Sequence, residues 1–167
     1  LTFTGTLEAS AEVSVTGGAA ADAITGGGGN DTIIGGAGAN VLTGNAGVDS
    51  ITGGADADTI TGGAGADKLV GGNGANKFFY LSSAADATGT GETITGGTGT
   101  DTVIVSGGTT AVDFSNDTLS ALNTLELTKD SAGADDDNAQ SLTMTDAQID
   151  GFAIINSKAG DNITLSD

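Results

Sequence analysis

The sequence has no proline, cysteine, tryptophan or histidine, and aromatic residues make up only 4% of its 167 residues. Because large aromatic side chains fill much of an ordinary globular core, we do not expect such a core here. Hydrophobic residues nevertheless make up 37% of the chain, which is too many for a disordered segment. The 30 glycines allow the backbone to turn tightly. Together these features favour a fold with tight turns around a narrow core.

Basic residues are also scarce, with 4 lysines and no arginine against 22 acidic residues, a net charge of −18. Proteins that bind nucleic acids contact phosphates through Lys and Arg, so we exclude a nucleic-acid partner. A chain this acidic repels itself when it becomes compact, so we expect a cation in the folded state. Calcium suits carboxylate and carbonyl oxygens, whereas the histidine and cysteine ligands typical of zinc and copper are absent.

No apolar run approaches the roughly 20 residues that a membrane-spanning helix needs. The N-terminus lacks the basic and then apolar pattern of a signal peptide. Without histidine, cysteine or arginine, the chain has few groups for acid–base or nucleophilic catalysis. Serines such as Ser82 and Ser83 have no plausible base. We therefore predict that the chain is not an enzyme.

A nine-residue repeat occupies Gly17–Phe79 in seven consecutive units: GGAAADAIT, GGGGNDTII, GGAGANVLT, GNAGVDSIT, GGADADTIT, GGAGADKLV and GGNGANKFF. A degenerate unit follows, and a further full unit, GGTGTDTVI, spans Gly96–Ile104. Glycines at positions 1, 2 and 4 permit the positive φ angles of a compact reversal. Asn45 and Asp56 replace glycine with residue types that tolerate this conformation, whereas Ala20 predicts a loosened first turn.

Position 8 of the repeat is always apolar: Ile24, Ile33, Leu42, Ile51, Ile60, Leu69 and Phe78. We expect positions 7 to 9 to form a short strand with position 8 pointing inward. Two units then make one coil of 18 residues, and the coils stack around a thin core. The pattern predicts an all-β fold, a parallel β-roll or right-handed β-solenoid.

Position 6 carries a short side chain with an oxygen atom in each unit: Asp22, Asp31, Asn40, Asp49, Asp58, Asp67, Asn76 and Asp101. Calcium takes six to eight oxygen ligands from carboxylates and carbonyls together. We therefore predict several calcium ions, each held between stacked turns by position 6 and by the backbone carbonyls of the turns that begin at Gly26, Gly35, Gly44, Gly53, Gly62, Gly71 and Gly96. Asp56 and Glu92 are further candidates. The alternative is turn chemistry alone, because Asp and Asn favour tight turns.

The repeats resemble those of the RTX family, whose consensus nonapeptide forms a calcium-binding parallel β-roll. The resemblance covers Gly17–Phe79 and Gly96–Ile104, and it implies type I secretion of an unfolded chain with calcium-triggered folding outside the cell. The segment AVDFSNDTLSALNTLELT and the lysine-poor, Thr-, Ala- and Gly-rich composition resemble bacterial surface-layer proteins and giant adhesins.

Odd and even units should lie on opposite edges of the roll. The even units then place Asp31, Asp49 and Asp67 on one edge, and the odd units alternate Asp and Asn on the other. We expect the edge that carries only Asp to bind calcium more tightly. The threonines at position 9 form a ladder that could suggest ice binding, but an ordinary solvated strand face explains them better.

The rest of the chain differs in composition and lacks the nine-residue repeat. Residues 1–16 alternate as one or two leading strands, residues 17–104 form the calcium-binding roll, and residues 105–167 form wider solenoid rungs or a C-terminal cap. Alternating segments at 111–114, 124–128, 141–145 and 162–166 predict strands, with short helical turns near 116–122 and 146–150. We interpret the acidic run 135–137 as a solvated loop.

These features favour a calcium-binding structural module of a secreted, extracellular cell-surface protein, with self-association or a surface matrix as its partner. The alternative is the C-terminal secretion and folding domain of an exported enzyme, such as a protease or lipase.

Overall fold

The computed structural model describes residues 4–6, 11–81, 91–106, 112–114, 116–128, 141–144, 152, 154–156 and 162–165. Within these residues all regular structure is β-strand, and every paired strand is parallel to its neighbour. Two described strands, Thr4–Thr6 and Ser14–Thr16, lie in the leading segment where alternation predicted them, whereas the acidic run 135–137 lies outside the described residues. No helix in the described part is long and apolar enough to cross a bilayer.

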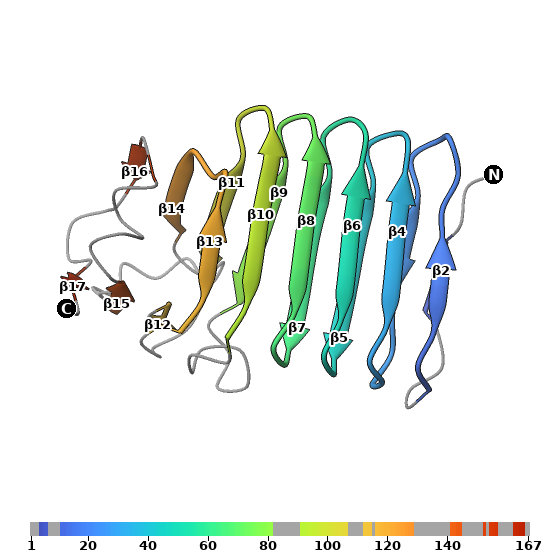
Figure 1. Cartoon of the computed structure of the whole chain (residues 1–167), viewed down its shortest axis with the longest axis horizontal. Helices are drawn as coiled ribbons and strands as arrows, with labels where there is room; N and C mark the ends of the chain where they lie inside the picture. The colour runs from blue at the N-terminus through green and yellow to red at the C-terminus, as the bar shows by residue number, and fades with distance from the viewer. Residues whose placement is uncertain are drawn as a thin grey trace, which may run out of the picture.

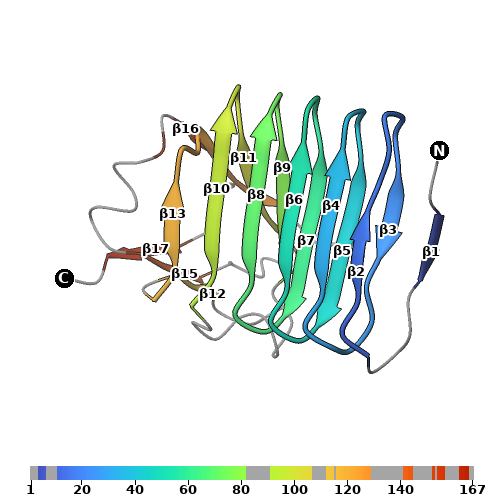
Figure 2. The same ribbon diagram turned by 45° about the vertical axis from the view of Figure 1, so that its right-hand side comes forward.

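Two large sheets face each other and form a parallel β-roll (Figure 1, Figure 2). The eight-stranded sheet contains, in order, β1 (Thr4–Thr6), β3 (Ala23–Thr25), β5 (Val41–Ala46), β7 (Thr59–Ala64), β9 (Lys77–Leu81), β11 (Thr102–Ser106), β14 (Thr124–Thr128) and β16 (Ile154–Asn156). The six-stranded sheet contains β2 (Ser14–Thr16), β4 (Thr32–Gly36), β6 (Ser50–Gly54), β8 (Lys68–Asn73), β10 (Thr93–Thr98) and β13 (Thr118–Ser120). The predicted fold class is confirmed.

The chain crosses from one sheet to the other at every repeat, as the 18-residue coil requires. Thr32 pairs with Ser50 and Val41 pairs with Thr59, so each strand lies beside the strand two units later. Odd and even units therefore lie on different sheets, and their turns lie on opposite edges, as predicted.

The strands are longer than the three residues predicted. β5 and β7, for example, continue through position 3 of the following unit. Burial alternates along β7, with Ile60 and Gly62 inside and their neighbours more exposed. Sequence reasoning missed this extension because position 1 is glycine, which has no side chain to reveal an inward-facing position.

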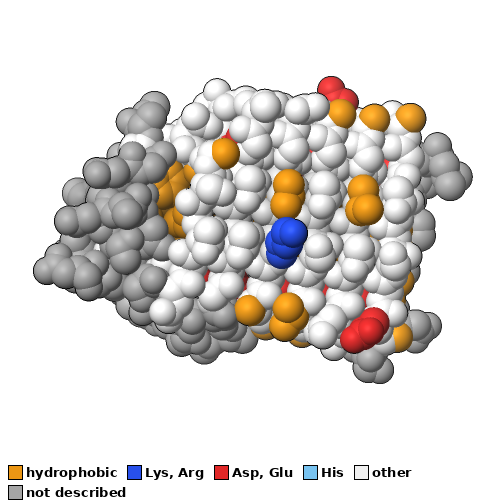
Figure 3. Space-filling model, viewed as in Figure 1, with side chains coloured by type: hydrophobic (Ala, Val, Ile, Leu, Met, Phe, Trp, Pro, Cys, Tyr) orange, Lys and Arg blue, Asp and Glu red, His pale blue; other side chains and the backbone are white. Residues whose placement is uncertain are grey.

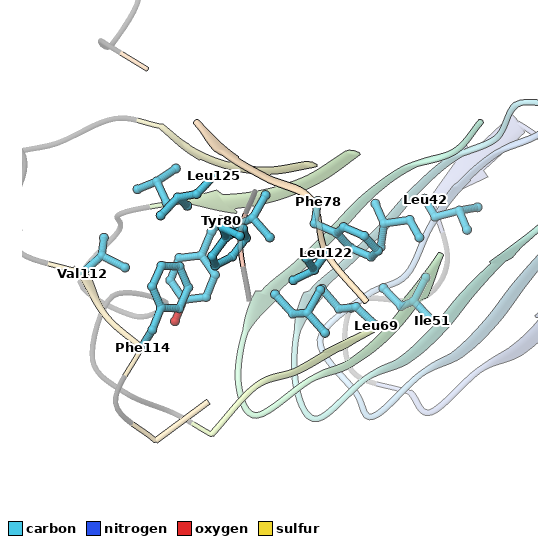
Figure 4. Close-up of a cluster of buried hydrophobic side chains, with 14 of the residues drawn as sticks. Leu42, Ile51, Leu69, Phe78, Tyr80, Val112, Phe114, Leu122 and Leu125 are labelled. Carbon is cyan, nitrogen blue, oxygen red and sulfur yellow. The ribbon is translucent and has the colours of Figure 1, made fainter. Parts of the chain in front are cut away.

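The core is a narrow double row between the two sheets, to which each repeat contributes one large apolar side chain. All seven position-8 residues are buried, with Leu69 the most exposed at 3%. Figure 4 shows Leu42 and Phe78 of the eight-stranded sheet lying opposite Ile51 and Leu69 of the six-stranded sheet. The row widens where Tyr80 packs edge-on against Phe114, with ring centroids 4.6 Å apart.

The coils lengthen after β9. Lys68 pairs with Thr93 and Lys77 with Thr102, a shift of 25 residues, and Thr102 pairs with Thr124, a shift of 22. A third parallel sheet of β12 (Val112–Asp113), β15 (Ser141–Met144) and β17 (Asn162–Leu165) joins this part. The strands expected from alternation near these positions are thus present. The division into three segments stays a prediction.

The helical turn expected near 116–122 is wrong. Thr118–Ser120 is strand β13, which pairs with β10 in the six-stranded sheet. Pairing with β10 outweighs the helical tendency of a short polar segment, because each strand residue gains inter-strand hydrogen bonds. The second predicted helical turn, at 146–150, lies outside the described residues.

Candidate metal centre

The position-6 residues stack in two columns, one along each edge of the roll. We call the first the alternating column: Asp22, Asn40, Asp58, Asn76, Asp101 and Asn123. We call the second the acidic column: Asp31, Asp49, Asp67, Glu92 and Asp117. All of these side chains are buried except that of Asn123, which is half-buried. The columns continue past the regular repeats into the longer coils.

One oxygen of each Asp or Asn side chain holds the preceding coil in place. The backbone N–H of Asp31 donates to Asp49 Oδ1 at 2.7 Å, and that of Asp49 donates to Asp67 Oδ1 at 2.8 Å. The alternating column repeats the arrangement, with the N–H of Asn40 donating to Asp58 Oδ1 at 2.8 Å. These bonds satisfy turn N–H groups that the strand ladders do not reach.

The second carboxylate oxygen lies against the glycine that begins the same turn. A Cβ on Gly44 or Gly53 would collide with Oδ2 of Asp49 or Asp58, respectively, and with the carbonyl oxygen of the next turn on that edge. Glycine at position 1 therefore leaves a space, which we call a cradle, into which a carboxylate oxygen and a backbone carbonyl converge. Glycine is thus required at position 1 for steric reasons.

Among the residues that the structure describes, four carboxylate oxygens in the cradles are buried and accept no hydrogen bond: Oδ2 of Asp49, Asp58, Asp67 and Asp101. A buried anionic oxygen without a partner is costly, and a cation beside it would offset that cost. Hard oxygen ligands of this kind suit calcium. The residues present therefore fit the ion that the sequence predicts.

Six of the seven carbonyls predicted as ligands lie beside a cradle, and their metal role stays a prediction. The carbonyl oxygens of Gly35, Gly44, Gly53, Gly62, Gly71 and Gly96 each lie at the position-1 glycine of the preceding turn on their edge. The carbonyl of Gly26 instead accepts a hydrogen bond from Asn45 Nδ2 at 3.2 Å. Ala121, which sequence reasoning missed, supplies the carbonyl beside Gly96 and Asp101.

The first two turns are built differently from the others. Gly18 N–H donates to Asp22 Oδ2 at 2.6 Å, and Gly27 N–H donates to Asp31 Oδ2 at 2.8 Å. In later turns the position-2 residue has a positive φ, for example 125° at Gly54, whereas Gly18 and Gly27 do not. The peptide orientation at position 2 thus decides whether a backbone amide faces the carboxylate. The second turn shares this difference although Gly29 stands at its position 4, so Ala20 does not account for it, and the loosened first turn stays a prediction.

Asp56 forms a hydrogen bond between turns, and its predicted role as a metal ligand stays a prediction. It occupies position 4 with a φ of 71°, so the predicted tolerance of a left-handed conformation is confirmed here and at Asn45, whose φ is 87°. Its exposed carboxylate accepts the N–H of Gly38 from the preceding odd turn at 3.0 Å. Asp56 therefore links two turns at the surface.

Burial raises the pKa of three column carboxyls, those of Asp49, Asp58 and Asp67. The pKa of Asp67 rises to about 6, chiefly through burial; the N–H of Asp49 lowers it and the Asp49 carboxylate raises it. Burial likewise raises the pKa of Asp49 and of Asp58, against hydrogen bonds that lower it. The carboxylates are thus poorly stabilised as anions by the protein alone.

Within the part of the chain that the structure describes, no three acidic side chains gather into a conventional metal cluster. Each turn contributes one column side chain, and the next contributes backbone carbonyls. A cation here would be held mainly by the backbone, as expected for a repeat rich in glycine.

The comparison with family models agrees with this geometry. A model of four copies of the RTX calcium-binding nonapeptide repeat matches residues 16–51 and again residues 43–78. Residues 16–78 are RTX calcium-binding repeats. The RTX segment ends where the coils lengthen, between Phe78 and Glu92. The search of curated proteins and the search of solved structures found no match to the chain.

Sequence reasoning missed Asp117 and Asn123, the column residues of the longer coils. Asp117 Oδ1 accepts the N–H of Glu92 at 2.9 Å, and Asn123 Oδ1 accepts the N–H of Asp101 at 2.7 Å. The signal was present: both residues are followed by Thr-Leu, as Asp31 and Asp58 are followed by Thr-Ile. It was hidden because the Gly-Gly pair is absent in front of them.

Proposed function

We propose that this chain is a calcium-dependent structural module of a secreted bacterial cell-surface protein, of the surface-layer or adhesin kind. The RTX segment consists of repeats that belong to a calcium-binding class. The observation that carries the proposal is the set of four buried carboxylate oxygens without partners, each beside the glycine of a cradle.

Calcium binding and folding should be one process in the RTX segment. Asp49 and Asp67 occupy adjacent coils, which lie about 4.8 Å apart in a sheet, and their charges repel each other. The core beside them contains one large side chain per repeat, so hydrophobic burial offers little to offset this repulsion. Bound calcium adds stability in proportion to the logarithm of its concentration, about 2.7 kcal/mol per site at a hundredfold excess over Kd.

A structural role is supported by the surface of the roll. The face formed by the six-stranded sheet shows mainly uncharged polar side chains and backbone, with scattered apolar side chains (Figure 3). Strands also continue beyond the RTX segment, and the eight-stranded sheet extends to β16. A stack that continues past its calcium repeats suits a protein that builds a rigid surface and binds further copies of itself.

The test is a calcium titration of metal-free protein followed by far-ultraviolet circular dichroism. We expect a cooperative gain of β-structure with calcium and none with magnesium at the same concentration, since magnesium requires a compact octahedral site. A spectrum that excess chelator leaves unchanged would contradict calcium-dependent folding.

Negative-stain microscopy of the calcium-loaded protein tests the surface role. Ordered sheets or fibres support a surface-layer or adhesin module. Dispersed single particles favour the alternative, a folding domain of an exported enzyme.

A further inference from the structure

The two columns place different atoms in their cradles. In the acidic column, a carboxylate oxygen of Asp49 or Asp67 faces the position-1 glycine. In the alternating column the amide nitrogen of Asn40 takes that place at Gly35, 2.6 Å from where a Cβ would stand. Asn76 Nδ2 does the same at Gly71. The asparagine cradles therefore hold a hydrogen-bond donor where the aspartate cradles hold an acceptor.

The orientation of each asparagine amide is fixed by its neighbour. The N–H of Asp22 donates to Asn40 Oδ1 at 2.9 Å, and the N–H of Asp58 donates to Asn76 Oδ1 at 3.0 Å. Turning either amide over would bring its nitrogen against a buried N–H, which sets two donors face to face and leaves both unsatisfied. The nitrogen must therefore face the cradle, and it cannot coordinate a cation.

The amide nitrogens of Asn40 and Asn76 also donate hydrogen bonds. Asn40 Nδ2 donates to Asp58 Oδ1 at 3.0 Å, and Asn76 Nδ2 donates to Asp101 Oδ1 at 2.9 Å. Asn76 Nδ2 also lies 3.4 Å from the carbonyl oxygen of Gly74 in its own turn. Each asparagine thus directs a positive dipole at the next carboxylate of its column.

We propose that Asn40 and Asn76 close their cradles to cations, so that the two edges of the roll bind calcium in different patterns. On the alternating edge, ions bind at the cradles of Asp58 and Asp101, with the closed cradle of Asn76 between them. On the acidic edge, ions bind at the adjacent cradles of Asp49 and Asp67. This inference rests on the proposed calcium-binding function.

The spacing has a physical consequence. Ions in adjacent coils would be about 4.8 Å apart, whereas ions separated by an asparagine cradle would be about twice as far apart and repel each other about half as strongly. The alternating edge should therefore bind its ions more independently of one another than the acidic edge does.

The test is the number of bound calcium ions, measured by native mass spectrometry and by equilibrium dialysis at saturating calcium. Asn76→Asp should open its cradle and bind one ion more than the wild type. Asn73→Asp makes the same change of charge in the same turn at an exposed position, so it should leave the number unchanged. Equal numbers for Asn76→Asp and the wild type would overturn the inference.

A reciprocal variant covers the case in which Asn76→Asp fails to fold. Asp58→Asn keeps the oxygen that accepts the N–H of Asn40 and replaces the cradle oxygen with a nitrogen, so it should bind one ion fewer. Glu12→Gln removes the same charge from an exposed side chain outside both columns and should bind as many ions as the wild type. If Asp58→Asn also matches the wild type, the inference is wrong.

The two proposals fail in different ways. A wild-type chain that binds no calcium would remove the proposed function itself. A wild-type chain that binds calcium, with variants at Asn76 and Asp58 that do not change the number of ions, would remove only the closed asparagine cradles.

Discussion

The 18-residue coils of Gly17–Phe79, which we call the short coils, and the longer coils that follow Leu81 differ in how their interior is filled. A short coil places two large apolar side chains between the sheets, such as Ile51 and Ile60. The longer coils place several there, including Val103 and Val105 from one strand and Leu125 and Leu127 from the next. The conformational entropy lost in ordering 18 residues costs more free energy than the burial of two apolar side chains contributes. The short coils thus depend on their turns, and the longer coils have a core.

Removing calcium should break this comparison most clearly. We expect chelation to remove most of the hydrogen-exchange protection of β4–β8, since their turns carry uncompensated carboxylates, while β11 and β14 exchange more slowly. Hydrogen exchange with mass spectrometry measures both regions in one sample. Equal loss of protection in the two regions would show that the larger core confers no independence.

Truncating one core side chain in each region gives the next largest effect. Ile60→Ala and Leu125→Ala each remove a fully buried side chain and should each cost about 2–5 kcal/mol in the free energy of unfolding. Ile60→Ala should also raise the calcium concentration at the folding midpoint, because folding and binding are coupled there. If Leu125→Ala shifts that midpoint as much, the two regions fold as one unit.

A pair of glycine substitutions sharpens the comparison within the short coils. Gly63 has a φ of 115°, and a Cβ there would collide with the carbonyl of Asn45. Gly63→Ala should therefore lower the free energy of unfolding by more than about 1–2 kcal/mol. Gly18 holds the same repeat position without a positive φ, so Gly18→Ala should cost less than about 1 kcal/mol. Thermal denaturation in calcium measures both, and equal costs would mean that the first turn is built like the later ones.

Acid should replace part of the calcium requirement, with a smaller effect. Burial raises the pKa of Asp67 to about 6 and that of Asp49 and Asp58 above their ordinary value, so the folded state binds more protons than the unfolded state. The metal-free roll is then most stable below the ordinary pKa of about 4 and loses this stability as the pH rises through about 6. We expect resin-stripped protein to gain some β-structure between pH 7 and pH 4. No gain would show that the carboxylates are not what opposes folding.

The regular part of the fold could be predicted because the nine-residue repeat recurs in a fixed phase. The phase of the glycines gave the sheets, the buried row and the position-6 columns as far as Asn76. The strand lengths could not be read in this way, because the inward-facing position 1 is glycine. The longer coils were harder still, because without the Gly-Gly pair and a fixed period only the Thr-Leu that follows Asp117 relates it to Glu92, which Thr-Ile follows.

The stacking of the position-6 residues could be predicted from the sequence, whereas the orientation of the groups around them could not. Nothing in the letters of the first two repeats shows that Gly18 and Gly27 turn their N–H groups toward Asp22 and Asp31. The role of Asn40 also depends on a bond to a backbone group 18 residues away. The orientation of these groups depends on hydrogen bonds and contacts between neighbouring coils, so the sequence of a single repeat does not determine it.

The hydrogen bonds of the two columns give the roll a direction. Column residues such as Asn76 donate their N–H to a side chain from the coil that follows, here that of Asp101. A chain cut after any coil would leave the last turn with a buried donor and no acceptor. Growth from the N-terminal end always leaves the newest coil incomplete until its successor closes. The roll is therefore a polar stack, and its C-terminal coils complete the ones before them.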